Sequence, residues 1–349
     1  MTLLLKVDLN DLNSSAALDA LEQAAAILRA GGTVAFPTET VYGLGANALD
    51  PAAAGKIFRA KQRPAWDPLI VHIADEEMLP LVADEISEVA HALIAAFWPG
   101  PLTLLLPRSS LIDDSITAGR LLVAVRMPSH PVARALIRMA GVPIAAPSAN
   151  RFGHTSPTTA RHVLDDLEGR IDAVLDGGST PHGVESTVLD PAPHPVILYR
   201  PGALTVEQIR SVAGEVELFV APENLKEREP ESLPSPGVGL RHYAPRARLV
   251  LLESASPEAQ QNALAEAAQK SETEQIGLML PEGWPAPETA TAIYRWGAWD
   301  SVEELATRLF AGLRELDDAG CTMILCPLPT EKGIGLAIRD RLRKAATPG

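Results

Sequence analysis

The sequence is poor in cysteine, in aromatic residues and in long apolar runs. Its 349 residues include only Cys321 and Cys326, with no His or Cys cluster beside them, which argues against a zinc site. We expect both to be reduced thiols in or beside a buried strand. Because aromatic residues make up 4% of the chain, the core must rest on Ala, Leu, Val and Ile.

The chain also lacks the segments that would direct it to a membrane or out of the cell. No apolar run approaches the roughly 18 residues that a membrane span needs. The N-terminal stretch MTLLLKVDLNDLN acquires acidic residues too early for a signal peptide and is more typical of a first strand. We therefore expect a cytoplasmic protein without a membrane partner.

Basic residues are outnumbered by acidic ones, and the formal net charge is −14. This charge argues against a broad surface for nucleic-acid phosphates. It leaves room for one small basic pocket that takes a single nucleotide.

The first two thirds of the chain has more predicted strands than helices. Residues 14–32 have helical apolar spacing with a Ser cap, Asp50 and Pro51 begin another helix, and Thr205 and Gln208 form a capping-box pattern. A further helix over 130–141 stops at Gly141. The strand-like stretches are 33–36, 68–73, 101–107, 121–128, 142–150, 172–178, 185–190 and 195–202. Since strands and helices do not alternate cleanly, we expect a mixed α/β sheet, open or partly curled.

The last third of the chain has a different pattern. Residues 215–246 begin acidic and Pro-rich, which is typical of a linker. The remainder alternates strand and helix, which predicts a small parallel sheet with covering helices. The predicted elements are strands over 248–253, 276–280 and 322–326 and helices over 257–270, 301–320 and 336–346. No glycine-rich phosphate loop accompanies them. The sequence thus predicts a domain over 1–214, a linker over 215–246 and a domain over 247–349.

Two groups of basic residues suggest chemistry. Lys61 and Arg63 in KQRP follow a helix and would point the same way on an extended backbone, which suits a polyphosphate. The alternative is a solvated helix end, where cations are favoured. Arg126 follows the apolar VAV of a strand, and a buried guanidinium requires a carboxylate from the protein or from a ligand.

Other polar residues stand within apolar strands or at their ends. His72 lies inside the otherwise apolar run PLIVHI, where a core role is the simpler alternative to ligand binding. Ser148 and Asn150 lie at the end of the strand-like 142–150 stretch and could line a site or merely form a turn. Ser186 and Arg200 lie at strand edges and are unremarkable alone.

Taken together and in order, these motifs resemble one family. PTETVYGLGANA, KQRPAWDPLIVHI, FWPGPLTLLLP, VAVRMPSHP, PSANRFGHTSPT, GVESTVLD and YRPGAL are similar to the YrdC-like threonylcarbamoyl-AMP synthases. SPG…RHYAP and the final GIGLAIRDRLRKAA resemble the longer, two-domain form of that family, whose C-terminal domain is Rossmann-like. The resemblance covers nearly the whole chain. It implies a YrdC-like domain with a mixed, twisted α/β sheet and a smaller parallel α/β domain.

The resemblance also implies a reaction and a set of residues. Such enzymes are nucleotidyltransferases that condense L-threonine, bicarbonate and ATP into threonylcarbamoyl-adenylate and release pyrophosphate. A separate tRNA threonylcarbamoyl transferase complex then modifies the adenosine beside the anticodon. The positions that match the threonine site are Thr40, His72, Arg126 and Ser186. The positions that match the ATP site are Lys61, Arg63, Asp67, Ser148, Asn150, Ser156, Arg200 and Tyr243.

Within this pattern Arg126 would pair with the carboxylate of threonine, and Tyr243 would reach back from the linker and close over the site. One position departs from the family: Asp67 stands where asparagine is expected. A carboxylate there would repel phosphates unless it binds Mg²⁺ or faces a ribose or base donor. We expect Mg²⁺ to enter the site as its complex with ATP. The sequence shows no recognisable set of metal ligands, and no residue stands out as an obligatory general base.

Two rival interpretations remain open. YrdC-like domains have been regarded as binders of double-stranded RNA, although the acidic balance and few aromatic residues count against that role. Related domains in carbamoyltransferases handle carbamoyl-adenylate, but those chains carry zinc-finger and acylphosphatase segments that this sequence lacks.

Overall fold

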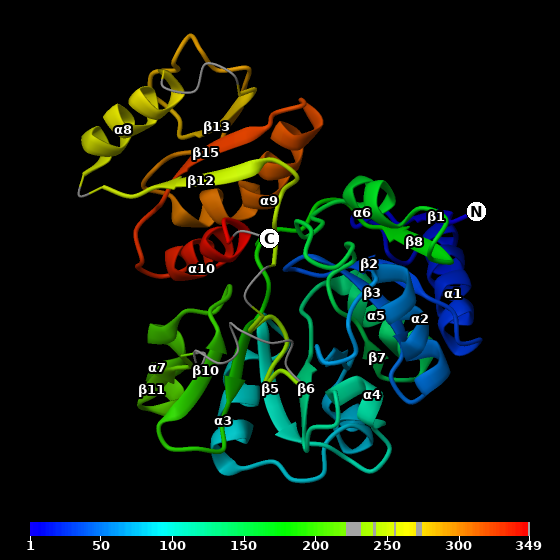
Figure 1. The fold of residues 1–349 in the computed structure, drawn as a ribbon. Coiled ribbons are helices and arrows are strands. Elements are labelled where there is room, and N and C mark those ends of the chain that lie inside the picture. Colours follow the sequence, from blue (N-terminus) through cyan, green and yellow to red (C-terminus); the bar gives the residue numbers. More distant parts are fainter. Residues whose placement is uncertain (221–231, 240–241, 255, 270–273, 348–349) are drawn as a thin grey trace. The chain divides into compact units, whose positions relative to one another are not determined.

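A computed structural model describes residues 1–220, 232–239, 242–254, 256–269 and 274–347 (Figure 1). The chain divides into two compact units, and each is described by itself. The first unit comprises residues 1–152, 156–181 and 185–239, and the second comprises residues 153–155, 182–184 and 240–349. The predicted linker, 215–246, lies partly outside the described residues, at 221–231 and 240–241.

The first unit is built on one mixed sheet, as the sequence predicted. Its strands are β1 (Leu3–Lys6), β2 (Val34–Pro37), β3 (Tyr42–Asn47), β4 (Ile70–His72), β5 (Leu102–Pro107), β6 (Leu122–Arg126), β7 (Ile144–Ala145), β8 (Ala173–Asp176), β9 (Thr187–Asp190), β10 (Val196–Arg200) and β11 (Val216–Leu218). Their order in space is β1-β8-β2-β3-β7-β4-β6-β5-β9-β10-β11, with parallel and antiparallel neighbours. Strands β4, β6, β5, β9 and β10 are thus consecutive neighbours, and this group carries most of the site described below.

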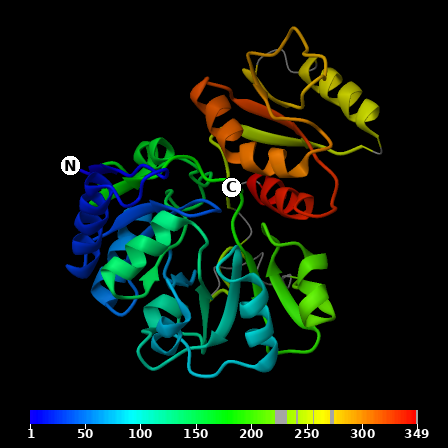
Figure 2. The ribbon, with the colours of Figure 1, turned by 180° about the vertical axis from the view of Figure 1, so that it is seen from behind.

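Helices cover both faces of this sheet (Figure 1; Figure 2). They are α1 (Ser15–Arg29), α2 (Pro51–Lys61), α3 (Glu88–Phe97), α4 (Asp114–Thr117), α5 (Pro131–Ala140), α6 (Ala160–Leu167) and α7 (Val206–Ala213), with a 3₁₀ turn at Glu76–Leu81. Helices α1 and α5 share a core with Val34 and Phe36 of β2. The intervening Ala35 packs with α2, α3, α6 and α7. This alternation follows from the two-residue period of a strand.

The predicted helix ends are confirmed. Ser14 caps α1 by accepting a hydrogen bond from the N–H of Ala17, and Asp50 caps α2 with Pro51 at its first position. Thr205 and Gln208 form both bonds of a capping box at α7. These signals are local, so they can be recognised without knowing the fold.

In the first unit, the structure differs from the sequence-based expectation in three strands. The stretch predicted over 142–150 is a strand only at β7, because Pro143 and Pro147 have no N–H to donate to a sheet on either side of it. Strand β3 was not predicted, since its two glycines lower strand propensity. Here Gly45 is required: a Cβ at that position would lie 2.7 Å from Cε1 of Phe36. Strand β11 lies within the predicted linker and pairs with β10.

The second unit contains the predicted parallel sheet. Its strands are β12 (Arg248–Leu252), β13 (Ile276–Leu280), β14 (Ala292–Arg295) and β15 (Met323–Pro327), in the order β12-β15-β13-β14, all parallel. Its helices are α8 (Pro257–Gln269), α9 (Val302–Asp318) and α10 (Gly335–Ala345). Strand β14 was not predicted, because it is short and follows a stretch rich in Pro, Glu and Thr.

The two cysteines follow the sequence-based expectation. Cys326 lies in β15, Cys321 lies two residues before it, and both are buried free thiols. Burial raises the pKa of each thiol. In the part of the chain that is described, no helix combines the length and the hydropathy of a membrane span.

Gly202 offers a test of how tightly the end of the first sheet is packed. A Cβ there would lie 2.3 Å from the backbone nitrogen of Thr187, so we expect Gly202→Ala to lower the free energy of unfolding by roughly 2 kcal/mol or more. In the control Gly55→Ala, the new Cβ meets only the flexible end of Arg59 at 3.4 Å inside helix α2. That change should stabilise by up to about 1 kcal/mol. Denaturant unfolding measures both, and equal effects would contradict the packing described.

Candidate functional site

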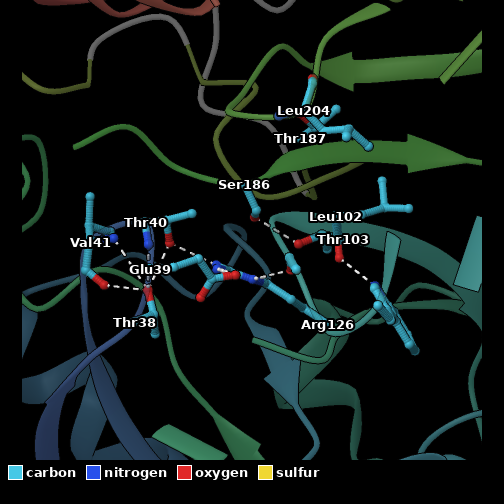
Figure 3. Close-up of polar contacts among 12 residues, drawn as sticks. Thr38, Glu39, Thr40, Val41, Leu102, Thr103, Arg126, Ser186, Thr187 and Leu204 are labelled. Carbon is cyan, nitrogen blue, oxygen red and sulfur yellow. Dashed lines mark hydrogen bonds and ion pairs between the residues drawn. The ribbon is translucent and has the colours of Figure 1, made fainter. Parts of the chain in front are cut away.

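The turn between β2 and β3 is fixed by its own threonines. The hydroxyl of Thr38 donates to the carbonyl of Val41 (2.7 Å) and accepts from the N–H groups of Thr40 and Val41 (3.2 and 3.3 Å). The Oγ1 atoms of Thr38 and Thr40 lie 2.8 Å apart. These bonds hold Glu39 and Thr40 in one conformation, in which both side chains point toward Arg126 (Figure 3).

Arg126 ends β6 and is buried at the centre of the sheet. Its Nη2 lies 2.7 Å from Oε1 of Glu39, its Nη1 donates to Oγ1 of Thr40 (2.9 Å), and its Nε donates to the carbonyl of Gly100 (3.3 Å). Burial raises the pKa of Glu39, but the charge and hydrogen bond of Arg126, together with backbone hydrogen bonds, outweigh burial, and the net shift is downward. The partner of the buried guanidinium is therefore Glu39. The expected pairing of Arg126 with the carboxylate of threonine stays a prediction.

His72 is the neighbour of Arg126 on the adjoining strand, β4. Burial, reinforced by the positive charge of Arg126, lowers the pKa of His72 to about 3. The ring meets Phe36 edge-on, with 6.3 Å between centroids. His72 is consequently a neutral imidazole at physiological pH, able to accept or donate one hydrogen bond but not to carry charge.

Ser186 joins two groups of predicted site residues. Its Oγ lies 2.8 Å from Oγ1 of Thr103 on β5, the residue that pairs with Arg126 across β5 and β6 (Figure 3). Arg200 at the end of β10 donates from Nη2 to Oγ of Ser186 and from Nε to its carbonyl, both at 3.1 Å. Next to Ser186, the hydroxyl of Thr187 is tied to the backbone of Leu204. A predicted threonine-binding residue and a predicted ATP-binding residue thus touch directly.

Lys61 is the last residue of α2 and is almost fully buried. Its Nζ donates to the carbonyl oxygens of Ser148 and Asn150, so the lysine ties the helix to the loop after β7. Burial and the nearby Arg63 lower the pKa of Lys61 well below its usual value, against the opposing effect of Asp166 and Asp67. The expected extended backbone is wrong here. The intervening Gln62 is left-handed, with φ of 55°.

Arg63 and Asp67 form a second buried ion pair. Nη2 of Arg63 lies 2.8 Å from Oδ1 of Asp67, while its guanidinium also donates to the carbonyls of Asp67 (3.1 Å) and Pro68 (2.7 Å). Burial raises the pKa of Asp67, and Arg63, Lys61 and Arg200 act in the opposite direction without cancelling the rise. In this structure the unexpected carboxylate faces a cation of the protein.

The remaining predicted residues lie in two places. Ser156 donates to Oε1 of Glu185 at 2.5 Å. The backbone of Ser148 forms an isolated antiparallel β-bridge with Gly43 of β3. All four residues belong to the first unit. Tyr243 belongs to the second unit, where its ring stacks on Phe310 at 5.7 Å and lies under Arg341 at 5.1 Å. Its expected closure over the nucleotide stays a prediction.

Three residues of these contacts were given no role by the sequence. Glu39, Thr103 and Glu185 are buried and bind Arg126, Ser186 and Ser156 respectively. The need of Arg126 for a carboxylate was a usable signal, but choosing Glu39 requires the position of the β2–β3 turn. Among the described residues no group of three or more His, Cys, Asp or Glu is arranged to hold a metal ion.

The chain combines a mixed sheet, with buried arginines at the ends of β6 and β10, and a smaller parallel α/β unit, and proteins with this combination are known. A family model described as "Telomere recombination" matches residues 26–202, and one described as "Threonylcarbamoyl-AMP synthase, C-terminal domain" matches residues 204–347. Threonylcarbamoyl-AMP synthase of Pyrococcus abyssi is 46% identical over 324 residues, covering 93% of each chain. The enzyme of that name from Bacillus subtilis is 44% identical over 327 residues, covering 93% of this chain and 92% of its own.

Structural similarity agrees with these matches. The crystal structure of P. abyssi Sua5 complexed with L-threonine superposes with a TM-score of 0.90 and 43% identity, covering 99% of this chain and 98% of that one. The class defined by the fold is a YrdC-like sheet domain joined to a C-terminal parallel α/β domain. The chain belongs to the threonylcarbamoyl-AMP synthase family, in its two-domain form.

The Glu39–Arg126 pair gives a prediction about stability and pH. Breaking a buried pair from one side costs about 3–5 kcal/mol, so Glu39→Gln should lower the free energy of unfolding by that order at pH 7. Because the folded pKa of Glu39 lies below 4.5, the contribution is complete above pH 4.5 and is lost as the pH falls through the folded value. Urea unfolding at pH 7 and at acid pH measures this: the difference in the free energy of unfolding between wild type and variant should be smaller at acid pH than at pH 7.

The control for this prediction is Glu22→Gln, which removes the same charge from the exposed pair between Glu22 and Arg29. An exposed pair contributes about 0–1 kcal/mol, so this variant should stay close to wild type. A loss for Glu39→Gln no larger than that of the control would contradict the description of the buried pair.

Proposed function

We propose that the chain is an L-threonylcarbamoyladenylate synthase. It would convert L-threonine, bicarbonate and ATP into threonylcarbamoyl-adenylate and pyrophosphate, the first step in forming threonylcarbamoyladenosine beside the tRNA anticodon. One observation carries the assignment. The predicted amino-acid residues and a predicted nucleotide residue meet at Ser186, in a chain that its relatives match from end to end.

The chemistry needs positioning and charge neutralisation more than acid–base catalysis. The threonine amine adds to bicarbonate with loss of water and gives a carbamate. A carbamate oxygen then attacks the α-phosphorus of ATP in line, the bond to the β-phosphate oxygen breaks, and pyrophosphate leaves. A site that holds both reactants in this geometry supplies much of the rate enhancement.

The proposed amino-acid pocket is formed by Thr40, His72, Arg126 and Ser186. P. abyssi Sua5 has been crystallised with L-threonine, which supports this class of ligand for a chain 43% identical to it. Arg126 already holds Glu39 and Thr40, so any carboxylate that it receives joins an existing network. The neutral His72 beside it adds a hydrogen-bonding group without a second positive charge.

The proposed nucleotide pocket is formed by Lys61, Arg63, Asp67, Ser148, Asn150, Ser156 and Arg200, with Tyr243 as a further contact. Arg200 can reach a phosphate beside Ser186, whereas Lys61 acts mainly by fixing the backbone of Ser148 and Asn150. ATP would enter as its Mg²⁺ complex. A cytoplasmic location and transfer of the adenylate to a tRNA-modifying complex belong to the same proposal.

The proposed activity predicts that pyrophosphate release depends on both threonine and bicarbonate. Purified protein with ATP, Mg²⁺, bicarbonate and L-threonine should release pyrophosphate, and omission of threonine or of bicarbonate should each reduce the rate to background. Pyrophosphate appears only if the carbamate has formed and attacked the α-phosphorus. Release that ignores threonine, from protein shown to be folded, would contradict the proposal, and salt-sensitive tRNA binding would then favour the RNA-binding alternative.

A further inference from the structure

Asp67 is a fully buried carboxylate among the residues proposed to receive the nucleotide. It lies between helix α2 and strand β4, four residues after Arg63. The ion pair of 2.8 Å between Nη2 of Arg63 and Oδ1 of Asp67 is accompanied by bonds from the same guanidinium to the carbonyls of Asp67 and Pro68. The guanidinium of Arg63 is therefore bound both to the backbone carbonyls of residues 67 and 68 and to the side chain of Asp67.

Two other cations also favour the ionised form of Asp67. Lys61 and Arg200 act on the ionisation of Asp67 in the same direction as Arg63, and burial acts against all three. The three cations come from two places in the fold: Lys61 and Arg63 from the end of α2, and Arg200 from the end of β10. A negative side chain thus lies where a negative ligand is expected.

A carboxylate and a phosphate are alternative partners for one guanidinium, because both offer paired oxygens to its planar donors. In a buried site, the repulsion between the carboxylate and the phosphate is poorly screened. Replacing the carboxylate by an amide of the same shape keeps an oxygen that can accept from Arg63 but removes the charge. The carboxylate therefore satisfies Arg63 before the nucleotide binds and opposes the phosphates when it does.

We propose that Asp67 acts as an internal competitor for the phosphates of the nucleotide and lowers the affinity of the site for ATP. This inference rests on the proposed function, since it concerns the same nucleotide pocket. It makes Asp67 a determinant of affinity rather than a group that takes part in the reaction. It also gives a physical consequence to the departure from asparagine.

The test is the affinity of Asp67→Asn for adenine nucleotides, measured by calorimetry with ATP, ADP, AMP and adenosine, each with and without Mg²⁺. We expect ATP to bind about tenfold more tightly to the variant than to wild type, on the scale of a partly screened charge. The gain should shrink as phosphates are removed and vanish for adenosine. It should be smaller with Mg²⁺, which already neutralises part of the phosphate charge.

The matched control is Asp165→Asn. Asp165 forms an ion pair with Arg161 at the same four-residue spacing, but at the surface, where the arginine side chain is 83% exposed. The control makes the same change of residue and of net charge away from the proposed pocket. Its affinity for all four ligands should equal that of wild type, which separates a local effect from a change in overall charge.

Asp67→Ser provides a second variant, neutral and smaller, in case the amide does not fold. It should show the same dependence on phosphate number. Unchanged or weaker ATP binding by a folded Asp67 variant would overturn the inference, and a loss confined to Mg²⁺-containing titrations would show that the carboxylate acts on the metal. If wild type itself bound no ATP, the proposed function would fail too, whereas normal wild-type binding without a gain in the variants would refute only the role of Asp67.

Discussion

The site depends on one buried ion pair, between Glu39 and Arg126. Neither charge can be buried alone without a cost of several kcal/mol, so the turn between β2 and β3 must stay over the end of β6. Thr38 fixes that turn from within, and Thr40 adds a second bond to the guanidinium. The stretch PTET is therefore a turn that is fixed by its own hydrogen bonds and that positions Arg126, rather than a surface turn.

From Arg126 the polar contacts continue across neighbouring strands. His72, Arg126 and Thr103 lie side by side on β4, β6 and β5, and Ser186 and Arg200 follow at the ends of β9 and β10. Side chains far apart in sequence meet because the sheet order brings these five strands together. A site built along the ends of rigid strands suits a reaction whose main demand is the alignment of two reactants.

Much of this could be predicted from the sequence where the signal was local. Ser14, Asp50 and the Thr205–Gln208 pair mark helix starts through bonds within three residues, and the alternating C-terminal pattern predicted its parallel sheet. Glu39 could not be assigned to Arg126, because 87 positions separate them and only the strand order brings them together. The backbone contacts of Lys61 could not be predicted for a related reason: whether a cation meets a ligand or two backbone carbonyls depends on a loop 87 residues away. Strand β3 was not predicted because glycine has a low strand propensity. Its glycines are needed for close tertiary packing, which the local sequence does not reveal.

The central claim is that the network around Arg126 is the amino-acid site. It is tested most directly by a crystal structure of this chain with L-threonine. The account predicts that the carboxylate of the amino acid joins Arg126 while its other polar groups reach Thr40, His72 or Ser186. Threonine bound elsewhere, with the Glu39–Arg126 pair and its neighbours untouched, would contradict it.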